Sequence, residues 1–259
     1  MSVPRTTTVG DYRLSRIGLG TNRLTDTPEN RAFLAAAVDA GVGLIDTAHV
    51  YTGGESERTI GVALAPFEDD LAVATKGGYE PGGGRPERLR AELDESFERL
   101  QTDNIALYYL HRVDPEVPLA ETLSVLAEYR DAGRIRHVGL SQVTVDQIEL
   151  ARTVVPIAAV QNEYNLSERR YDDVVDFCER EIIPFIPFFP LRGATPVQLD
   201  EIAGRYSATP QQIKLAWLLK RSPSMTPIPG TLSLEHLKLN MAALDIDLSD
   251  EDYASLNGD

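Results

Sequence analysis

The stretch AGVGLID at residues 40–46 joins the end of a predicted helix to a predicted strand. Gly41 follows the last residue of a helical pattern, where a left-handed helix stop favours glycine. Residues 42–46 then form a short run that is apolar nearly throughout, which is typical of parallel strands covered on both faces. The same helix stop, followed quickly by an apolar run, recurs at residues 132–141, so the stretch predicts a repeated αβ unit.

Eight short apolar runs lie along the chain, at residues 16–20, 42–46, 71–75, 105–111, 137–141, 158–161, 184–188 and 225–229. Segments of helical period alternate with them, at residues 28–40, 56–64, 86–100, 118–132, 145–153, 171–181, 210–219 and 234–243. Eight βα units in about 250 residues are typical of an α/β fold of the (β/α)8 TIM barrel type. The alternative is an open doubly wound sheet, whose first strand typically leads into G-x-G-x-x-G. Residues 18–23 (GLGTNR) lack the third glycine, which favours the barrel.

The two ends of the chain predict additions to this barrel. Residues 6–14, with Gly10 and Asp11 at their centre, predict an N-terminal β-hairpin that covers the N-terminal mouth of the barrel. Residues 250–256 follow the capping pair Ser249 and Asp250 and predict a short C-terminal helix. Because no linker interrupts the alternation, we expect a single (β/α)8 barrel domain over residues 1–259.

The charge and the cysteine content exclude several classes of function. The 259 residues carry 25 Lys and Arg against 40 Asp and Glu, a formal net charge of −15. Nucleic acids and anionic membranes bind basic surfaces, so we expect neither as a partner. Cys178 is the single cysteine, and its helical surroundings predict a buried structural thiol. The N-terminus has no apolar signal-peptide segment, and we expect a cytoplasmic protein, a monomer or weak oligomer.

Ionisable residues stand where three of the predicted strands end. The second strand ends in Asp46, the third runs into Lys76 and the fourth ends in His111, while Tyr51 lies in the loop after the second strand. In a barrel of this type the carboxyl ends of the strands and the loops that follow them hold the active site. The sequence therefore predicts that these four side chains meet in one catalytic site.

Lys76 is the most informative of the four residues. The chain holds four Lys, at 76, 214, 220 and 238, against 21 Arg, so surface positive charge is carried by Arg. A Lys directly after a buried run needs a partner for its ammonium, and Asp46 on the adjacent strand can provide it. We expect the ammonium to lower the pKa of the Tyr51 phenol from about 10 and to make it a usable proton donor.

At this point the sequence resembles the aldo-keto reductase family over nearly its whole length. The motifs, in order, are GLGT at 18–21, GVGLIDTAHVY at 41–51, GESER at 54–58, ATK at 74–76, YLHR at 109–112, GRIRHVGLS at 133–141, VQNEYN at 160–165, F-x-P-L at 188–191 and IPGT at 228–231. The resemblance implies a reductase that transfers hydride from NADPH to an aldehyde or ketone, with NADH as a possible substitute. It assigns Tyr51 as the general acid, Lys76 and Asp46 as the pair that tunes it, and His111 as the group that orients the carbonyl.

The resemblance also implies which residues bind the cofactor and the substrate. Ser141 and Gln161 would hold the nicotinamide carboxamide, Phe188 would stack on the ring, and Arg192 would reach the pyrophosphate. The full implied cofactor set is Gly20, Thr21, Asn22, Asp46, Ser141, Gln142, Gln161, Phe188, Leu191, Arg192, Gly230, Thr231, His236 and Asn240. The implied substrate-binding residues are His49, Tyr79, Val113 and Phe189, with Val50 and Asn22 as further candidates for the pocket wall.

Four positions differ from the usual family pattern. Gln142 stands where Asn commonly follows Ser, and Phe188 stands where Tyr commonly stacks on the nicotinamide. Gly230 and His236 occupy positions at which the family often has a basic pair for the 2′-phosphate. We still expect NADPH to bind better than NADH, because Thr231 and the N-terminus of the following helix favour a phosphate. The loop at residues 190–198 is short, which predicts an open pocket.

Two other classes of function remain as alternatives. The first is a cofactor-sensing regulatory subunit of the same fold, although the four catalytic positions are retained. The second is a barrel lyase or aldolase in which Lys76 forms a Schiff base, a chemistry that Asp46 and Tyr51 also fit. The histidines at 49, 111, 137 and 236 show no metal-ligand spacing, so we expect no metal site.

Overall fold

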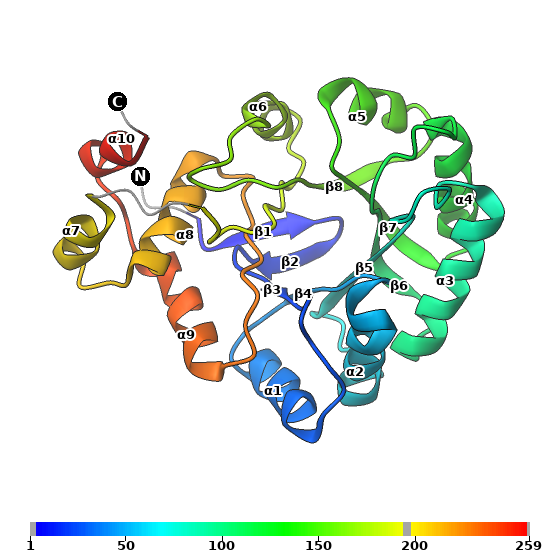
Figure 1. Cartoon of the computed structure of the whole chain (residues 1–259), viewed down its shortest axis with the longest axis horizontal. Coiled ribbons are helices and arrows are strands. Elements are labelled where there is room, and N and C mark those ends of the chain that lie inside the picture. Colours follow the sequence, from blue (N-terminus) through cyan, green and yellow to red (C-terminus); the bar gives the residue numbers. More distant parts are fainter. Residues whose placement is uncertain (1–3, 194–197, 258–259) are drawn as a thin grey trace.

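Six parallel strands form one curved sheet in the computed structural model, which describes residues 4–193 and 198–257 (Figure 1). The strands pair in the order of the chain, with β4 and β5 next to each other and β6 following, so the ends of β4, β5 and β6 lie side by side. Their bounds are β3 (Leu19–Gly20), β4 (Leu44–Asp46), β5 (Ala72–Gly77), β6 (Ile105–Leu110), β7 (Ile135–Ser141) and β8 (Ile157–Gln161).

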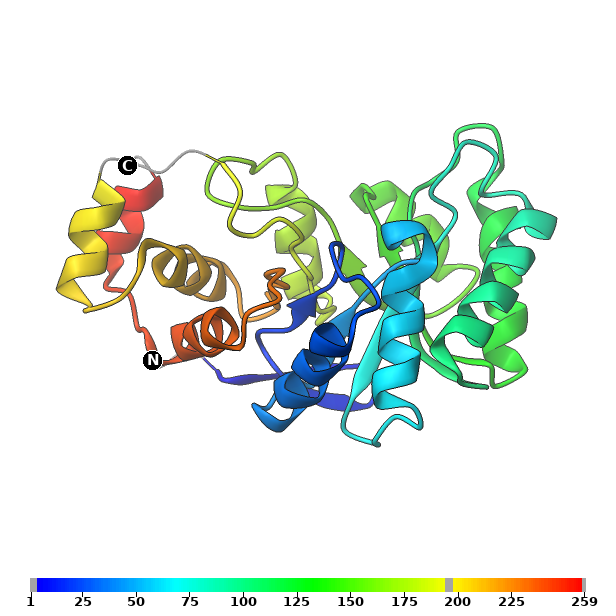
Figure 2. The ribbon, with the colours of Figure 1, turned by 60° about the horizontal axis from the view of Figure 1, so that its bottom comes forward.

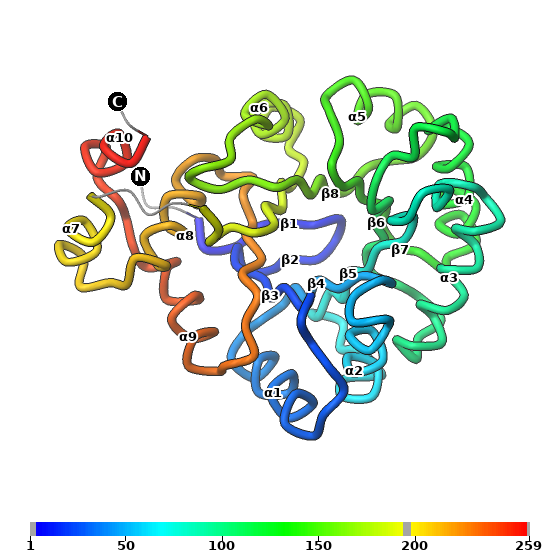
Figure 3. The backbone as a smooth tube through the Cα atoms, viewed as in Figure 1, coloured from blue at the N-terminus to red at the C-terminus, as the bar shows by residue number. Residues whose placement is uncertain are grey.

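The predicted strands at 184–188 and 225–229 lie in the seventh and eighth barrel positions, but they form isolated bridges instead of regular strands. Phe185 bridges Val160 on one side and Met225 on the other, and Gly20 bridges Gly230. The prediction of two regular strands here is therefore wrong. Both segments contain prolines, which lack the N–H group that a continuous ladder needs. The tube trace in Figure 3 shows both segments running beside the first and last strands of the sheet.

Helices follow the strands and cover the outside of the barrel (Figure 1). Their bounds are α1 (Pro28–Asp39), α2 (Glu55–Leu64), α3 (Pro86–Leu100), α4 (Leu119–Asp131), α5 (Val145–Arg152), α6 (Asp172–Arg180), α8 (Pro210–Arg221) and α9 (Leu234–Ala242). As the sequence predicts, Thr27 caps α1 by accepting a hydrogen bond from the Asn30 amide at 3.2 Å. Two further helices, α7 (Gln198–Arg205) and the predicted C-terminal α10 (Asp250–Asn257), lie together at one edge beside α8.

The predicted N-terminal hairpin is formed by β1 (Thr6–Val9) and β2 (Tyr12–Ser15). It lies across one end of the barrel (Figure 2), and its Val9 and Leu14 side chains are buried against the barrel interior. The interior they contact is apolar and contains Leu44, Ala72, Ala74, Ala106, Leu107, Tyr109, Ala159, Ile186 and Ile228. The hairpin thus closes the N-terminal mouth, and the polar strand ends lie at the opposite mouth.

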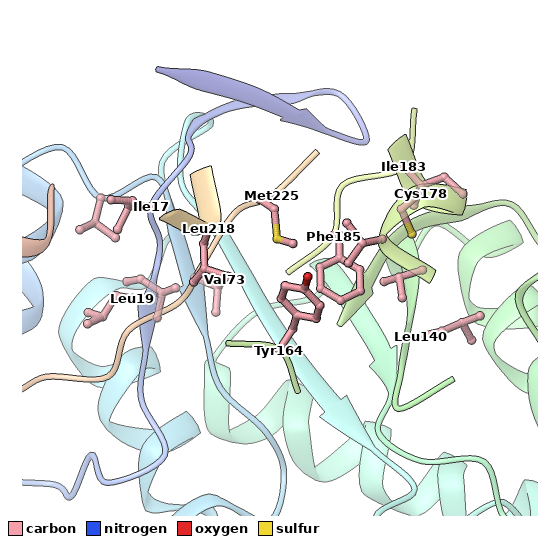
Figure 4. Packing of buried hydrophobic residues seen from close by; sticks show 14 of the residues in the cluster. Ile17, Leu19, Val73, Leu140, Tyr164, Cys178, Ile183, Phe185, Leu218 and Met225 are labelled. Atoms are coloured by element: carbon pink, nitrogen blue, oxygen red, sulfur yellow. The ribbon is translucent and has the colours of Figure 1, made fainter. Parts of the chain in front are cut away.

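A larger apolar cluster lies between the barrel and its helices. Figure 4 shows Tyr164 beside Phe185, with Cys178 on the far side of Phe185, and the centres of the two aromatic rings lie 5.8 Å apart in an edge-to-face arrangement. Burial raises the pKa of the Cys178 thiol to about 12, so the predicted structural thiol is confirmed. Arg16 links the segment before β3 to the segment after α8, because its buried guanidinium donates to the carbonyls of Ser222 and Met225 at 2.6 and 3.0 Å.

Candidate active site

A buried ion pair lies at the carboxyl ends of two neighbouring strands. Lys76, in β5, places its Nζ 2.6 Å from Asp46 Oδ1, at the end of β4, and the two side chains are 1% and 3% exposed. The same ammonium donates to the Thr47 carbonyl at 2.7 Å, and Gln161 Nε2 donates to the other Asp46 oxygen at 2.7 Å. The predicted partner of Lys76 is therefore confirmed, and both charges are held by further hydrogen bonds.

Two further predicted residues lie above this ion pair. Tyr51 begins a short 3-10 helix, η1 (Tyr51–Gly54), and the centre of its ring lies 5.0 Å from Lys76 Nζ. His111 directly follows β6, and its ring meets that of Tyr51 edge to face at 6.1 Å. The ring of Tyr79 also packs against this imidazole, with the two ring centres 4.7 Å apart. The structure thus brings the four predicted groups into one cluster.

Burial dominates the proton equilibria of this cluster. It raises the pKa of Tyr51, while the Lys76 ammonium acts in the opposite direction and the Asp46 carboxylate raises the pKa again. The expectation that Lys76 lowers the pKa of Tyr51 overall is wrong, because burial of the phenol outweighs the effect of the ammonium and Asp46 adds to the rise. Burial also lowers the pKa of His111 to about 2, with the positive charges of Lys76 and Arg112 adding to the effect. Tyr51 is therefore protonated and His111 neutral near pH 7.

A cavity of about 450 Å3 opens directly above the cluster. The predicted residues on its wall are Gly20, Thr21, Asn22, Asp46, Val50, Tyr51, Tyr79, His111, Ser141, Gln142, Gln161, Phe188, Phe189 and Gly230. Four wall residues were not predicted from the sequence, namely Glu80, Arg112, Pro190 and Ile228. Each of these four is adjacent in sequence to a predicted residue or belongs to a quoted motif. Nearness in sequence to the predicted residues therefore indicates that they belong to the cavity wall.

A second cavity, of about 770 Å3, adjoins the first at Gly230. The predicted residues on its wall are Leu191, Gly230, Thr231, His236 and Asn240. Arg23 also lines it, from the loop after β3, together with Thr209, Gln211, Leu232, Ser233 and Leu239. Arg23 is far in sequence from the other residues of this cavity, so no local pattern indicates it as part of the site.

Four predicted site residues do not line either cavity, and one of them, Lys76, is buried in its pair with Asp46. His49 turns to α3, where its Nε2 lies 3.0 Å from Glu95 Oε2. Val113 packs against the apolar cluster behind the barrel. Arg192 pairs with Glu163 at 3.2 Å, and its guanidinium lies 3.6 Å from the Phe189 ring. His49 and Val113 therefore have contacts outside the two cavities, whereas Arg192 stacks on a residue of the first cavity's wall. Residues 194–197 of the short loop lie outside the described residues.

The backbone beside the first cavity adopts left-handed conformations at residues that are not glycine. Gln142 has φ 57°, Phe189 has φ 50° and Thr52, next to Tyr51, has φ 49°. Such conformations carry a cost and persist where the surrounding structure holds them, as in binding sites. Tyr171 holds Gln142 by donating from its hydroxyl at 3.0 Å. The strained positions thus mark the same rim of the barrel as the cluster of ionisable residues.

Two further findings concern sites of other kinds. Over residues 4–193 and 198–257, no group of three or more His, Cys, Asp or Glu side chains is arranged to hold a metal ion. Within the same residues, no helix is both long and apolar enough to span a membrane.

The fold and the site together define a (β/α)8 barrel enzyme with a buried Lys–Asp pair, a tyrosine and a histidine at its carboxyl-terminal mouth. The profile of the Aldo/keto reductase family matches residues 16–258. The chain therefore belongs to the aldo/keto reductase family and is an oxidoreductase.

Relatives and solved structures agree with this assignment. The pyridoxine 4-dehydrogenase of Escherichia coli is 36% identical over 98% of this chain and 97% of its own length. An uncharacterized oxidoreductase of Schizosaccharomyces pombe is 39% identical over 97% of this chain and 89% of its own length. The thermostable aldo-keto reductase Tm1743, in complex with epalrestat, has a TM-score of 0.90 and 33% identity over 98% of both chains. An aldo-keto reductase from Klebsiella pneumoniae in complex with NADPH has a TM-score of 0.89 and 29% identity, covering 99% of this chain and 95% of that one.

Proposed function

We propose that this chain is an NADPH-dependent reductase of aldehydes or ketones, with Tyr51 as the proton donor. The observation that carries the proposal is the buried Lys76–Asp46 pair directly below Tyr51, on the floor of an open cavity. The NADPH complex of the Klebsiella pneumoniae relative and the name of the Escherichia coli relative support the same class of reaction.

The residues of the two adjoining cavities fit NADPH. In the first cavity, Gln161 uses its amide N–H for Asp46, which leaves its oxygen to accept from the nicotinamide carboxamide. The Phe188 ring is on the same wall and offers a stacking surface. In the second cavity, Arg23 provides a guanidinium for a phosphate, and Thr231 and Ser233 lie at the N-terminus of α9. When bound, NADPH would supply the hydride that reduces the carbonyl carbon.

Tyr51 would donate its proton to the carbonyl oxygen as that oxygen becomes negative. Because burial raises the pKa of Tyr51, the phenol holds its proton until the developing alkoxide accepts it. The adjacent Lys76 ammonium would stabilise the phenolate that forms, and Asp46 holds that ammonium in place. Neutral His111 would donate a hydrogen bond to the same oxygen and orient it.

The Schiff-base alternative fits the structure less well. The Lys76 ammonium makes hydrogen bonds to Asp46 and to the Thr47 carbonyl and is 1% exposed, so it is not a free amine. Burial lowers the pKa of Lys76, but Asp46 and Tyr51 together raise it by more, so the net shift of this pKa is upward. A Schiff-base lysine needs the opposite shift, because the neutral amine is the nucleophile.

We also propose that residues 1–259 form one catalytic domain that works in the cytoplasm as a monomer or weak oligomer. The single barrel with both cavities at one mouth supports the first part. The buried, protonated thiol of Cys178 supports a protein that does not depend on disulfides.

Oxidation of NADPH against a panel of aldehydes and ketones tests the proposal. Wild-type protein should oxidise NADPH when a suitable carbonyl is present, and Tyr51→Phe should lower turnover by about 10²–10⁴-fold with cofactor binding nearly unchanged. Turnover of Tyr51→Phe within tenfold of wild type would remove Tyr51 from its proposed role. Borohydride trapping of a carbonyl on Lys76 would instead support the lyase alternative.

A further inference from the structure

A second group of buried charges lies behind the loop that carries Tyr51. Glu57, on α2, is fully buried, and its Oε2 lies 3.3 Å from Nη1 of Arg99, on α3. Arg99 also pairs with Glu95 one turn earlier on its own helix. The Arg99 side chain is 18% exposed, so this ion pair is largely removed from water. A buried carboxylate requires such compensation, and Arg99 provides it.

This charge group contacts the chain next to both proposed catalytic residues. The second oxygen of Glu57 accepts a hydrogen bond from Thr75 Oγ1 at 2.6 Å, and Thr75 directly precedes Lys76. Arg99 Nη1 donates to the carbonyl of His49 at 3.1 Å, two residues before Tyr51. The His49 amide donates to the Lys76 carbonyl at 2.9 Å, which links the two contacts through the backbone.

The turn at Tyr51 depends on a neighbour to hold its shape. Thr52, Gly53 and Gly54 are all left-handed, with φ of 49°, 65° and 90°. A Cβ at Gly54 would lie only 2.5 Å from Cζ of Arg99, so the guanidinium packs directly against the turn. The two glycines adopt this region freely, but Thr52 carries a conformational cost there, which contacts from outside the turn must offset. Arg99 is placed to provide such a contact.

We propose that Arg99 is a positioning residue that holds the Tyr51 turn in register with the strand of Lys76. The guanidinium joins the His49 carbonyl, Glu57 and Glu95, and through Glu57 it reaches the residue before Lys76. The inference rests on the proposed function, because it acts through Tyr51 as proton donor. Displacing a reacting group by about 1 Å can cost about 10²-fold in rate, so a loosened turn lowers turnover without removing any group that touches the substrate.

Arg99→Lys and Arg99→Met test the proposal, with Arg90→Met as the matched control. The lysine keeps a positive charge but has one nitrogen, so it cannot hold Glu95 on one side and the His49 carbonyl and Glu57 on the other, as Nη2 and Nη1 of the planar guanidinium do. We expect Arg99→Lys to melt like the wild type and to lose about tenfold in kcat, with KM for NADPH within twofold. Arg99→Met should lose about 10- to 100-fold. Arg90 lies on the same helix in an exposed pair with Glu128, and its variant should behave as wild type.

Hydrogen exchange and a double variant separate positioning from general stability. Exchange of the backbone amides at residues 47–54 should accelerate about tenfold in Arg99→Lys, while the amides of β7 and β8 keep wild-type protection. In a Tyr51→Phe background, Arg99→Lys should cause no further loss of kcat, because the group it positions is gone.

Wild-type kcat in Arg99→Lys, or a full additional loss in the Tyr51→Phe background, would overturn the role of Arg99. If Tyr51→Phe itself keeps wild-type turnover, the proposed function fails instead. In that case accelerated exchange at residues 47–54 in Arg99→Lys would still support Arg99 as the residue that holds the turn, and unchanged exchange would overturn it.

Discussion

Replacing Lys76 by Met removes one charge of the buried pair and leaves the other in place. The Asp46 side chain is 3% exposed and, among the described residues, would keep only the hydrogen bond from Gln161. Removing one partner of a buried ion pair typically costs about 3–5 kcal/mol in unfolding free energy. Since each kcal/mol lowers Tm by about 2–4 °C in domains of 150–250 residues, we expect a loss of about 6–20 °C.

The double variant Lys76→Met with Asp46→Asn is the matched control for this loss. It removes both charges and keeps the volumes similar, so most of the lost stability should return. Neither variant should turn over a carbonyl substrate at the wild-type rate, because the ammonium that stabilises the Tyr51 phenolate is absent from both. The double variant should therefore regain most of the stability while its turnover stays low.

The measurement is thermal unfolding of the three proteins between pH 5 and 8. If Lys76→Met melts like wild type across that range, the reasoning from a buried, mutually dependent pair is refuted.

Three further outcomes can be checked on the same preparations. The pKa of His111 is lowered to about 2, so the neutral form persists above that pH and a kcat profile from pH 5 to 8 should show no limb from His111. Arg23→Gln should weaken NADPH by about 1–2 kcal/mol in titrations and NADH by less, because NADPH has one more phosphate for the guanidinium. Arg16→Met leaves several buried carbonyls without a donor and should cost about 2–4 kcal/mol in urea unfolding.

The sequence predicts most of this fold because its strands and its helices have different hydrophobic patterns: short runs that are apolar nearly throughout, and longer segments of helical period. The runs at 42–46 and 105–111 are apolar nearly throughout, and the structure places β4 and β6 there, β6 ending one residue earlier. The last two barrel segments differ, since proline removes the donors of a regular ladder while the chain keeps its path. Apolar pattern alone predicts where a segment lies and not how it is hydrogen-bonded.

The centre of the site was predictable because it lies at strand ends, where direction is fixed. Three neighbouring strands end at or beside Asp46, Lys76 and His111, so their sequence positions predict that these side chains meet. The structure places all three together. Side chains in the loops beyond had no such constraint. His49 and Val113 are as near to the strand ends in sequence as Tyr51 and Tyr79, yet they point away from the cavity. Irregular segments have no period from which the direction of a side chain could be read.

Arg23 shows why the phosphate end of the site was harder to predict than its centre. The sequence has little positive charge near Thr231 and His236, close to the end of the chain. The barrel closes by bringing Gly20 against Gly230, so the loop after the first strand lies beside the segment that follows the last. Arg23 therefore reaches the second cavity from more than two hundred positions away in the sequence. Ring closure, and not local pattern, determines which residues share that cavity.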